Sequence, residues 1–200
     1  MTIVKTCGKL YWAGEYAILE PGQLALIKAI PIYMTAEIKA SNDYRLYSDM
    51  FSYSVDLRPD SSYALIQETV ALVEEYLTAQ GVELQPFSLD VRGKMEREGK
   101  KFGLGSSGSV VVLVIKAMLA FYERLADREL LFKLASAVLL KRGDNGSMGD
   151  IACIVSEDLV LYQSFDREKV ADWLEKEDLQ AVLARDWGFS IRSVEPALKF

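Results

Sequence analysis

The sequence predicts an α+β fold. Short runs of alternating apolar and polar residues fill most of the first sixty positions, which is typical of strands with one buried face. Longer segments with apolar residues at helical spacing follow from position 61 onward. Hydrophobic residues make up 50% of the 200 positions, enough for a substantial core. Together these observations indicate a sheet that is covered by helices.

The strands of the first half follow from this alternation. Residues 2–13 read as one strand, or as two paired strands broken at Gly8. Pro21 and Gly22 form a turn signal. Further strands are expected after it, at residues 24–29, 32–40, 44–48, 51–57 and 86–92.

Helices are expected in the middle of the chain. Apolar residues at helical spacing predict a helix over residues 61–80, with Ser61 or Ser62 as its N-cap. Residues 110–115 are all β-branched or leucine and could form a strand on propensity alone. Because the apolar pattern continues without a break to residue 124, we expect a helix that is buried on all sides.

The remainder of the chain predicts both kinds of element. Asp127 is the expected N-cap of a helix over residues 128–141. Apolar runs at residues 151–155 and 159–163 read as the two strands of a hairpin. Residues 166–185 have helical spacing, and nothing distinctive is predicted beyond residue 188.

Net charge and hydropathy exclude several partners. The net charge is −6 and no long basic block occurs, so no nucleic-acid partner is expected. The longest apolar segment, residues 110–121 with Lys116 inside it, is too short to span a bilayer comfortably. The first residues lack the cationic and then apolar pattern of a signal peptide. We therefore expect a soluble, cytoplasmic protein without a membrane partner.

Histidine and cysteine content narrows the possible chemistry. The sequence has no histidine, which excludes a histidine general base, a Ser-His-Asp triad and a histidine-ligated zinc. Cys7 and Cys153 lie far apart in apolar surroundings, and we expect both to be reduced and buried. Acid–base chemistry must therefore depend on Asp, Glu, Lys or Tyr.

A glycine- and serine-rich segment precedes the predicted central helix. Its glycines allow tight bends, and amides at a helix N-terminus, together with the helix dipole, favour an anion. Lysines just before it add positive charge. The candidate phosphate-binding residues are Lys101, Gly103, Leu104, Gly105, Ser106, Ser107, Gly108 and Ser109. A loop that only caps a core helix remains an alternative.

Two familiar phosphate-binding motifs do not fit this segment. Gly103, Gly105 and Gly108 have the spacing of the dinucleotide-binding fingerprint, but the charged residues 94–101 are not the apolar strand that must precede it. The Walker A motif requires a lysine where Ser109 stands.

Three motifs together resemble those of the GHMP small-molecule kinases. Residues 9–17, KLYWAGEYA, resemble the first motif of that family. Residues 103–109, GLGSSGS, resemble its ATP-binding loop, and residues 146–150, GSMGD, stand where the family has a glycine-rich turn that ends in an aspartate. The resemblance runs along essentially all of the chain, so it is identified as a member of this family.

The resemblance implies a fold and an activity. The fold would be a mixed sheet with helices packed on one face, like the second domain of ribosomal protein S5. Within the family, the chain is most similar to kinases that act on (R)-5-phosphomevalonate. The residues that carry this similarity are Lys101, the Tyr11-Trp12 pair and residues 141–145. The implied reaction transfers the γ-phosphoryl group of ATP, with Mg²⁺, to that substrate. Mevalonate or homoserine as acceptor remains an alternative, as does a nucleotide-binding module without turnover.

The resemblance also implies roles for individual residues. Lys9 would bridge the donor and acceptor phosphates, and Ser107 would be a Mg²⁺ ligand. Asp150 matches the catalytic aspartate, and we expect it chiefly to orient Lys9 and the metal, with base catalysis secondary. The acceptor-site candidates are Glu15, Tyr16, Arg142 and Ser147.

The expected domain organisation is a single N-terminal, ATP-binding domain over residues 1–200. Nothing after Asp150 resembles the family's third, glycine-rich motif, which belongs to a C-terminal domain. We therefore expect apolar surface to be uncovered where that domain would dock, with self-association as a consequence. Activity of these 200 residues alone is uncertain.

Overall fold

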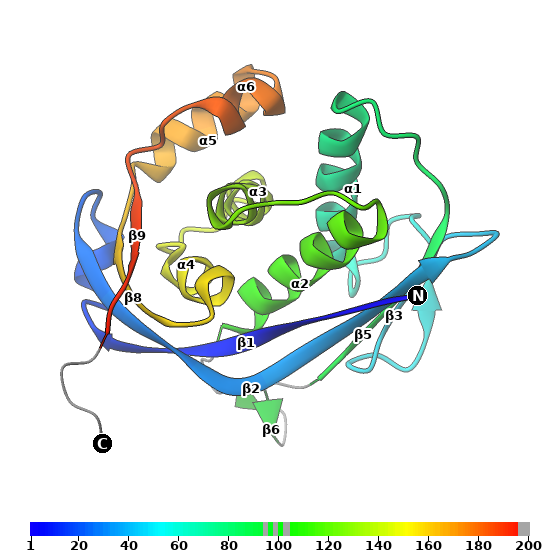
Figure 1. Ribbon diagram of the computed structural model, residues 1–200, viewed down its shortest axis with the longest axis horizontal. Coiled ribbons are helices and arrows are strands. Elements are labelled where there is room, and N and C mark those ends of the chain that lie inside the picture. Colours follow the sequence, from blue (N-terminus) through cyan, green and yellow to red (C-terminus); the bar gives the residue numbers. More distant parts are fainter. Residues whose placement is uncertain (94–95, 98–99, 102–104, 196–200) are drawn as a thin grey trace.

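The sheet is mixed and strongly curved, and the helices cover its concave face (Figure 1). This computed structural model describes residues 1–93, 96–97, 100–101 and 105–195, with the backbone alone at 96–97 and 100–101. Within the described residues the sheet contains β1 (Thr2–Ala13), β2 (Leu24–Ala40), β3 (Arg45–Ser48), β4 (Ser54–Val55), β5 (Phe87–Arg92), β8 (Leu159–Gln163) and β9 (Ser190–Ser193). The short strands β6 (Glu96–Arg97) and β7 (Lys100–Lys101) pair with each other.

Strand β2 organises this sheet. It lies antiparallel to β1 along most of its length, to β5 near its C-terminal end and to β8 near its N-terminal end. The pair β3 and β5 is parallel, which makes the sheet mixed as predicted. The expected break between residues 29 and 32 is wrong, because β2 continues through Pro31. The pairing shifts there instead, from Cys7 opposite Tyr33 to Gly8 opposite Ile30.

The helices form two layers over the sheet. The described helices are η1 (Ala17–Leu19), α1 (Ala64–Ala79), α2 (Ser106–Phe121), α3 (Arg128–Lys141), α4 (Gly149–Ser156), α5 (Arg167–Lys176) and α6 (Leu179–Ala184). Helices α2 and α4 contact β1 and β2, while α1 and α3 pack on α2. Helices α5 and α6 lie farthest from β1 and β2 (Figure 1).

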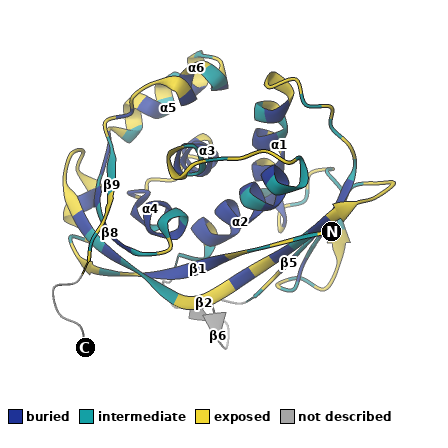
Figure 2. Cartoon of the chain, in the orientation of Figure 1, coloured by how far each residue is buried: buried dark blue, intermediate teal, exposed yellow. Residues whose placement is uncertain are grey.

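Helix α2 is the centre of the core, as its apolar sequence predicts. Every residue from Gly108 to Ile115 is buried, and Figure 2 shows buried positions along most of α2 and α3. A helix that is apolar all round is stable only where other elements surround it. The prediction of a fully buried central helix is confirmed.

Three further predictions of secondary structure need correction. Residues 151–155 form helix α4 rather than a strand, so the predicted hairpin with β8 is wrong. The predicted strand 51–57 is reduced to β4. Helix α1 has Tyr63 at its N-cap position, and the Asp60 carboxylate, rather than a serine, accepts from the amides of Ser62 and Tyr63.

Other expectations hold. Asp127 caps α3 by accepting from the amide of Leu130 at 2.8 Å. The segment 166–185 is helical, although it divides into α5 and α6, each with an aspartate N-cap. Cys7 and Cys153 are free thiols and both are buried. Among the described residues no helix has the length and apolar composition needed to cross a membrane.

Candidate active site

The N-terminal turns of α2 and α4 meet in the structure. Gly105 is the N-cap of α2 and adopts the left-handed conformation, with φ of 82°. The first helical bond runs from the Ser109 amide to the Gly105 carbonyl at 2.8 Å, so the amides before Ser109 lie at the open end of the helix. A methyl group at Gly108 would lie 2.7 Å from Oδ2 of Asp150 in the first turn of α4. The two helix ends therefore form one electropositive corner.

Lys9 reaches this corner from β1. The alternation of the strand turns Lys9 toward the helices, while Leu10 and Trp12 are about half exposed, at 50% and 56%. A methyl group at Gly105 would meet both Cγ and Cε of Lys9 at 3.1 Å. The lysine stem thus packs against the glycine that begins α2, and only 9% of the residue is exposed.

Asp150 is the acidic group of the corner. Its Oδ1 accepts a hydrogen bond from the amide of Ile151 at 2.9 Å. Burial raises the pKa of this carboxyl group, while the bond from Ile151 and the charge of Lys9 act in the opposite direction. Asp150 and Lys9 therefore influence each other electrostatically, as expected for groups that share one site.

Tyr11 and Ser147 connect β1 to the turn before α4. The Tyr11 hydroxyl and the Ser147 Oγ form a hydrogen bond of 3.0 Å, and Ser147 Oγ also accepts from the Gly149 amide at 3.3 Å. The Tyr162 hydroxyl donates to the Ser147 carbonyl at 2.9 Å. Burial raises the pKa of Tyr11 to about 12, so its hydroxyl is neutral at ordinary pH. This network fixes the turn that carries Asp150.

The glycine-rich corner matches a known family. The sequence model described as GHMP kinases N terminal domain matches residues 64–158, a segment that includes α2, α4 and the Asp150 turn. Residues 64–158 are therefore identified as a GHMP kinase N-terminal domain.

Two solved structures and one further protein are similar to nearly all of the chain. The chain is 73% identical to Streptococcus pneumoniae phosphomevalonate kinase in complex with phosphomevalonate and AMPPNP, with a TM-score of 0.97, over 99% of this chain and 60% of that one. A Listeria innocua protein, Lin0012, is 31% identical with a TM-score of 0.90, over 97% of this chain and 57% of that one. Phosphomevalonate kinase from Streptomyces sp. strain CL190 is 29% identical, over 99% of this chain and 59% of the relative. The chain thus spans about three fifths of the length of these relatives.

Several of the predicted site residues lie at the corner. Lys9, Asp150, Gly105 and Gly108 are in contact, as described above. Ser106 is partly exposed and Ser107 is exposed on the first turn of α2, so their hydroxyl groups are accessible to a ligand. Ser147 is connected to the corner through its hydrogen bond to Tyr11, and it is 7% exposed.

Glu15 and Tyr16 follow β1 on the loop before η1. Tyr16 is 83% exposed, and Glu15 is exposed as well. The negative charge of Glu15 is one of the influences that raise the pKa of Tyr11, after burial as the largest. Both side chains are therefore accessible to solvent, and Glu15 lies close enough to Tyr11 to act on it electrostatically.

Two predicted site residues make structural contacts instead. Ser109 is completely buried, and its hydroxyl donates to the carbonyl of Cys7 at 2.9 Å, so it fastens α2 to β1 and does not face a ligand. The Arg142 guanidinium pairs with Glu68 of α1, in a depression between α1 and α3 that none of the other described candidates lines. The predicted roles of Ser109 in phosphate binding and of Arg142 in acceptor binding therefore lack support. Gly103, Leu104 and the Lys101 side chain lie outside the described residues.

Sequence reasoning missed two contributors. Tyr11 was noted only as part of the Tyr11-Trp12 pair, although strand alternation places it on the same side as Lys9. Arg167 of α5 donates to the carbonyls of Leu19, Asn145 and Gly146, and so holds the turn before α4 from outside the family motifs. No sequence signal distinguishes Arg167 from an ordinary surface arginine.

Proposed function

We propose that the kinase to which this chain belongs transfers the γ-phosphoryl group of ATP to (R)-5-phosphomevalonate. The observation that carries the proposal is the contact of Lys9 and Asp150 with the glycines at the start of α2. The relative in complex with phosphomevalonate and AMPPNP is 73% identical over nearly all of this chain, which supports the same pair of substrates here.

The chemistry suits this corner. A phosphate oxygen of the acceptor attacks the γ-phosphorus, the bond from that phosphorus to the β,γ-bridging oxygen breaks, and ADP and 5-diphosphomevalonate result. Both reactants are anions, so catalysis depends on positioning and on neutralising charge. The open amides of α2 would hold the ATP phosphates, and the Lys9 ammonium would lie between donor and acceptor.

Asp150 is proposed to orient Lys9 rather than to act mainly as a base. The second pKa of a phosphate monoester is about 6, so at neutral pH the acceptor has little proton to lose. A base is therefore less necessary than for a hydroxyl acceptor. If Asp150→Asn abolished a pH dependence centred well above that phosphate pKa, base catalysis would be the main role after all.

Magnesium fits the oxygen donors at this corner. Among the described residues no group of three or more Asp, Glu or Cys side chains could hold a metal by itself. Mg²⁺ keeps several waters and is commonly bound by one or two protein oxygens together with substrate phosphates. The exposed hydroxyl of Ser107 and the Asp150 carboxylate would supply such oxygens, and the ion would neutralise phosphate charge.

We propose that residues 1–200 correspond to the N-terminal, nucleotide-binding domain of this kinase, since the relatives are longer. The acceptor would lie near Glu15, Tyr16 and Ser147. Free, buried Cys7 and Cys153 suit the reducing cytoplasm. Exposed apolar side chains, among them Leu10 and Trp12, would favour self-association of the isolated segment.

The test is a coupled assay of ADP release by the full-length protein with phosphomevalonate, mevalonate or homoserine in parallel. We expect turnover that needs phosphomevalonate and Mg²⁺ and that Lys9→Met slows to a residual rate measurable only by single turnover. Turnover with mevalonate or homoserine but not with phosphomevalonate would identify a different GHMP kinase. ATP binding without turnover of any acceptor would identify a nucleotide-binding module and contradict the proposal.

A further inference from the structure

The Lys9 ammonium lies over an aromatic ring of its own strand. Its Nζ is 4.7 Å from the centroid of the Tyr11 ring. Residues two apart on a strand point to the same face, so Lys9 and Tyr11 both face α4. The negative face of an aromatic ring attracts a cation at this distance, and more strongly where water is partly excluded. The ring therefore restricts where the ammonium can lie.

The other end of Tyr11 touches the turn that carries Asp150. Its hydroxyl bonds to Ser147 Oγ at 3.0 Å, and a methyl group at Gly149 would lie 2.4 Å from the Tyr11 oxygen. Gly149 is the first residue of α4, and Asp150 is the next. The absence of a side chain at position 149 is what allows the Tyr11 hydroxyl to approach so closely. One side chain thus contacts both the cationic and the acidic half of the corner.

We propose that Tyr11 is a positioning residue for phosphoryl transfer, whose ring holds the Lys9 ammonium and whose hydroxyl holds the Ser147–Asp150 turn. The inference rests on the proposed function for its kinetic consequences, although the geometry on which it depends does not. Tyr11 is not itself an acid or base in this scheme, because burial keeps its phenol protonated with a pKa of about 12.

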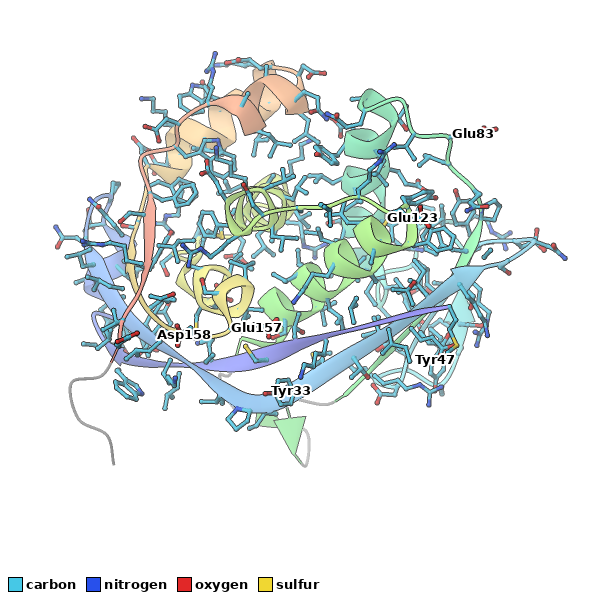
Figure 3. All side chains as sticks on the ribbon, in the orientation of Figure 1. Tyr33, Tyr47, Glu83, Glu123, Glu157 and Asp158 are labelled. Atoms are coloured by element: carbon cyan, nitrogen blue, oxygen red, sulfur yellow. The ribbon has the colours of Figure 1, made fainter. Side chains whose placement is uncertain are left out.

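A second lysine–tyrosine pair provides a matched control. Nζ of Lys5, also on β1, lies 4.6 Å from the centroid of the Tyr33 ring. Tyr33 belongs to the neighbouring strand β2 and lies on the sheet face away from the helices, where it is 47% exposed (Figure 3). A lysine–tyrosine contact of the same length thus occurs on strands β1 and β2, with its ring on the opposite face of the sheet from the corner.

The kinetic test compares three variants in the full-length protein. Tyr11→Phe removes only the hydroxyl, and we expect kcat to fall about fivefold, as for one lost hydrogen bond. Tyr11→Leu removes the ring as well, and we expect a fall of about 30-fold, with a smaller change in the KM for ATP. Tyr33→Leu should leave kcat within about twofold of the wild type, since its ring lies on the sheet face away from Lys9 and Asp150.

A double-mutant cycle separates positioning from a general loss of structure. In a Lys9→Met background, measured by single turnover, Tyr11→Leu should change the rate much less than in the wild type, because the cation that the ring holds is gone. An equal loss in both backgrounds would overturn the proposed action through Lys9. So would a Tyr11→Leu variant with wild-type kcat.

A spectroscopic measurement keeps the inference testable if turnover fails. A cation above an aromatic face experiences a ring-current shift, so the Lys9 Cε methylene signal, assigned with Lys9→Arg, should lie upfield in the wild type and in Tyr11→Phe. It should move to the ordinary lysine position in Tyr11→Leu. An unshifted Lys9 signal in the wild type overturns the positioning role whatever the kinetics show. A shifted signal in a protein without kinase activity would contradict the proposed function but retain the contact.

Discussion

Replacing Gly108 by alanine is the most direct test of the contact between α2 and α4. The added methyl carbon would lie 2.7 Å from Oδ2 of Asp150, 3.0 Å from Cδ1 of Ile151 and 3.3 Å from Cγ of Asp150. Ordinary contacts of such atoms are longer, so something must move. The nearest atom is the end of the Asp150 carboxylate, which can rotate away more easily than the backbone of either helix can shift.

The effects on stability and on activity should therefore differ in size. Glycine to alanine within a helix gains about 1 kcal/mol of propensity, whereas overpacking of a buried site costs about 1–3 kcal/mol. We expect the free energy of unfolding to fall by no more than about 1–2 kcal/mol. A displacement of the order of an ångström at a positioned catalytic group lowers turnover about 100-fold, equivalent to about 2.7 kcal/mol in the activation barrier.

The assay pairs urea denaturation with steady-state kinetics of the full-length Gly108→Ala variant. The same substitution in an Asp150→Asn background is the control, because displacement of a side chain that has already lost its charge should matter far less. A variant with turnover within threefold of the wild type would refute the close approach of Gly108 to Asp150. A loss of turnover that follows the unfolded fraction alone would refute the catalytic interpretation.

Three further predictions concern Lys133, Asp150 and Arg167. The Lys133 ammonium donates to two backbone carbonyls at the end of α6, at 3.0 and 2.8 Å, so Lys133→Met should lower the free energy of unfolding by about 2–3 kcal/mol in urea denaturation. Lys176 of α5 is exposed, and Lys176→Met should leave the free energy of unfolding nearly unchanged. Equal losses in the two variants would contradict this. Burial raises the pKa of Asp150 in the folded state, so the folded protein is favoured while this carboxyl group is protonated. That contribution to stability is present below the ordinary aspartate pKa and is lost as pH rises through the raised pKa. Asp150→Asn should therefore increase Tm more at pH 7 than at pH 4, and an equal increase at both pH values would contradict the raised pKa. Arg167→Ala should increase amide exchange at residues 145–150 more than Arg167→Lys does, because Arg167 holds two carbonyls of that segment.

The fold could be predicted from sequence wherever periodicity was unambiguous. Helices α2 and α3 and strands β1, β5 and β8 lie where their patterns place them. Residues 151–155 could not be assigned in this way, because a short apolar run gives the same signal for a buried strand and for a buried helix. Contacts of α4 with α2, α3 and three strands surround it on all sides, so its sequence shows no polar face that would identify a helix.

The candidate site was likewise predicted only in part from the sequence. The resemblance to the GHMP kinases predicted that Lys9 and Asp150 meet the start of α2, and the structure places them there. It did not distinguish serines that face a ligand from Ser109, whose hydroxyl is used to fasten α2 to β1. Nor did it show that Arg142 pairs with Glu68, since that partner comes from another helix 74 positions away in sequence.

The residues that could be recognised in advance share a physical property: each departs from what its element alone would favour. Lys9 is a charge on the buried face of a strand, Gly105 and Gly108 interrupt the start of a strong helix, and Asp150 follows Gly149 in an apolar run. Such departures weaken the local structure and persist only where the surroundings require them. Here the requirement is close approach, because a methyl group at positions 105, 108 or 149 would lie 3.1 Å from Lys9, 2.7 Å from Asp150 or 2.4 Å from Tyr11 respectively. Tyr11 and Arg167 fit their local structure without conflict, and for that reason only the three-dimensional contacts show what they do.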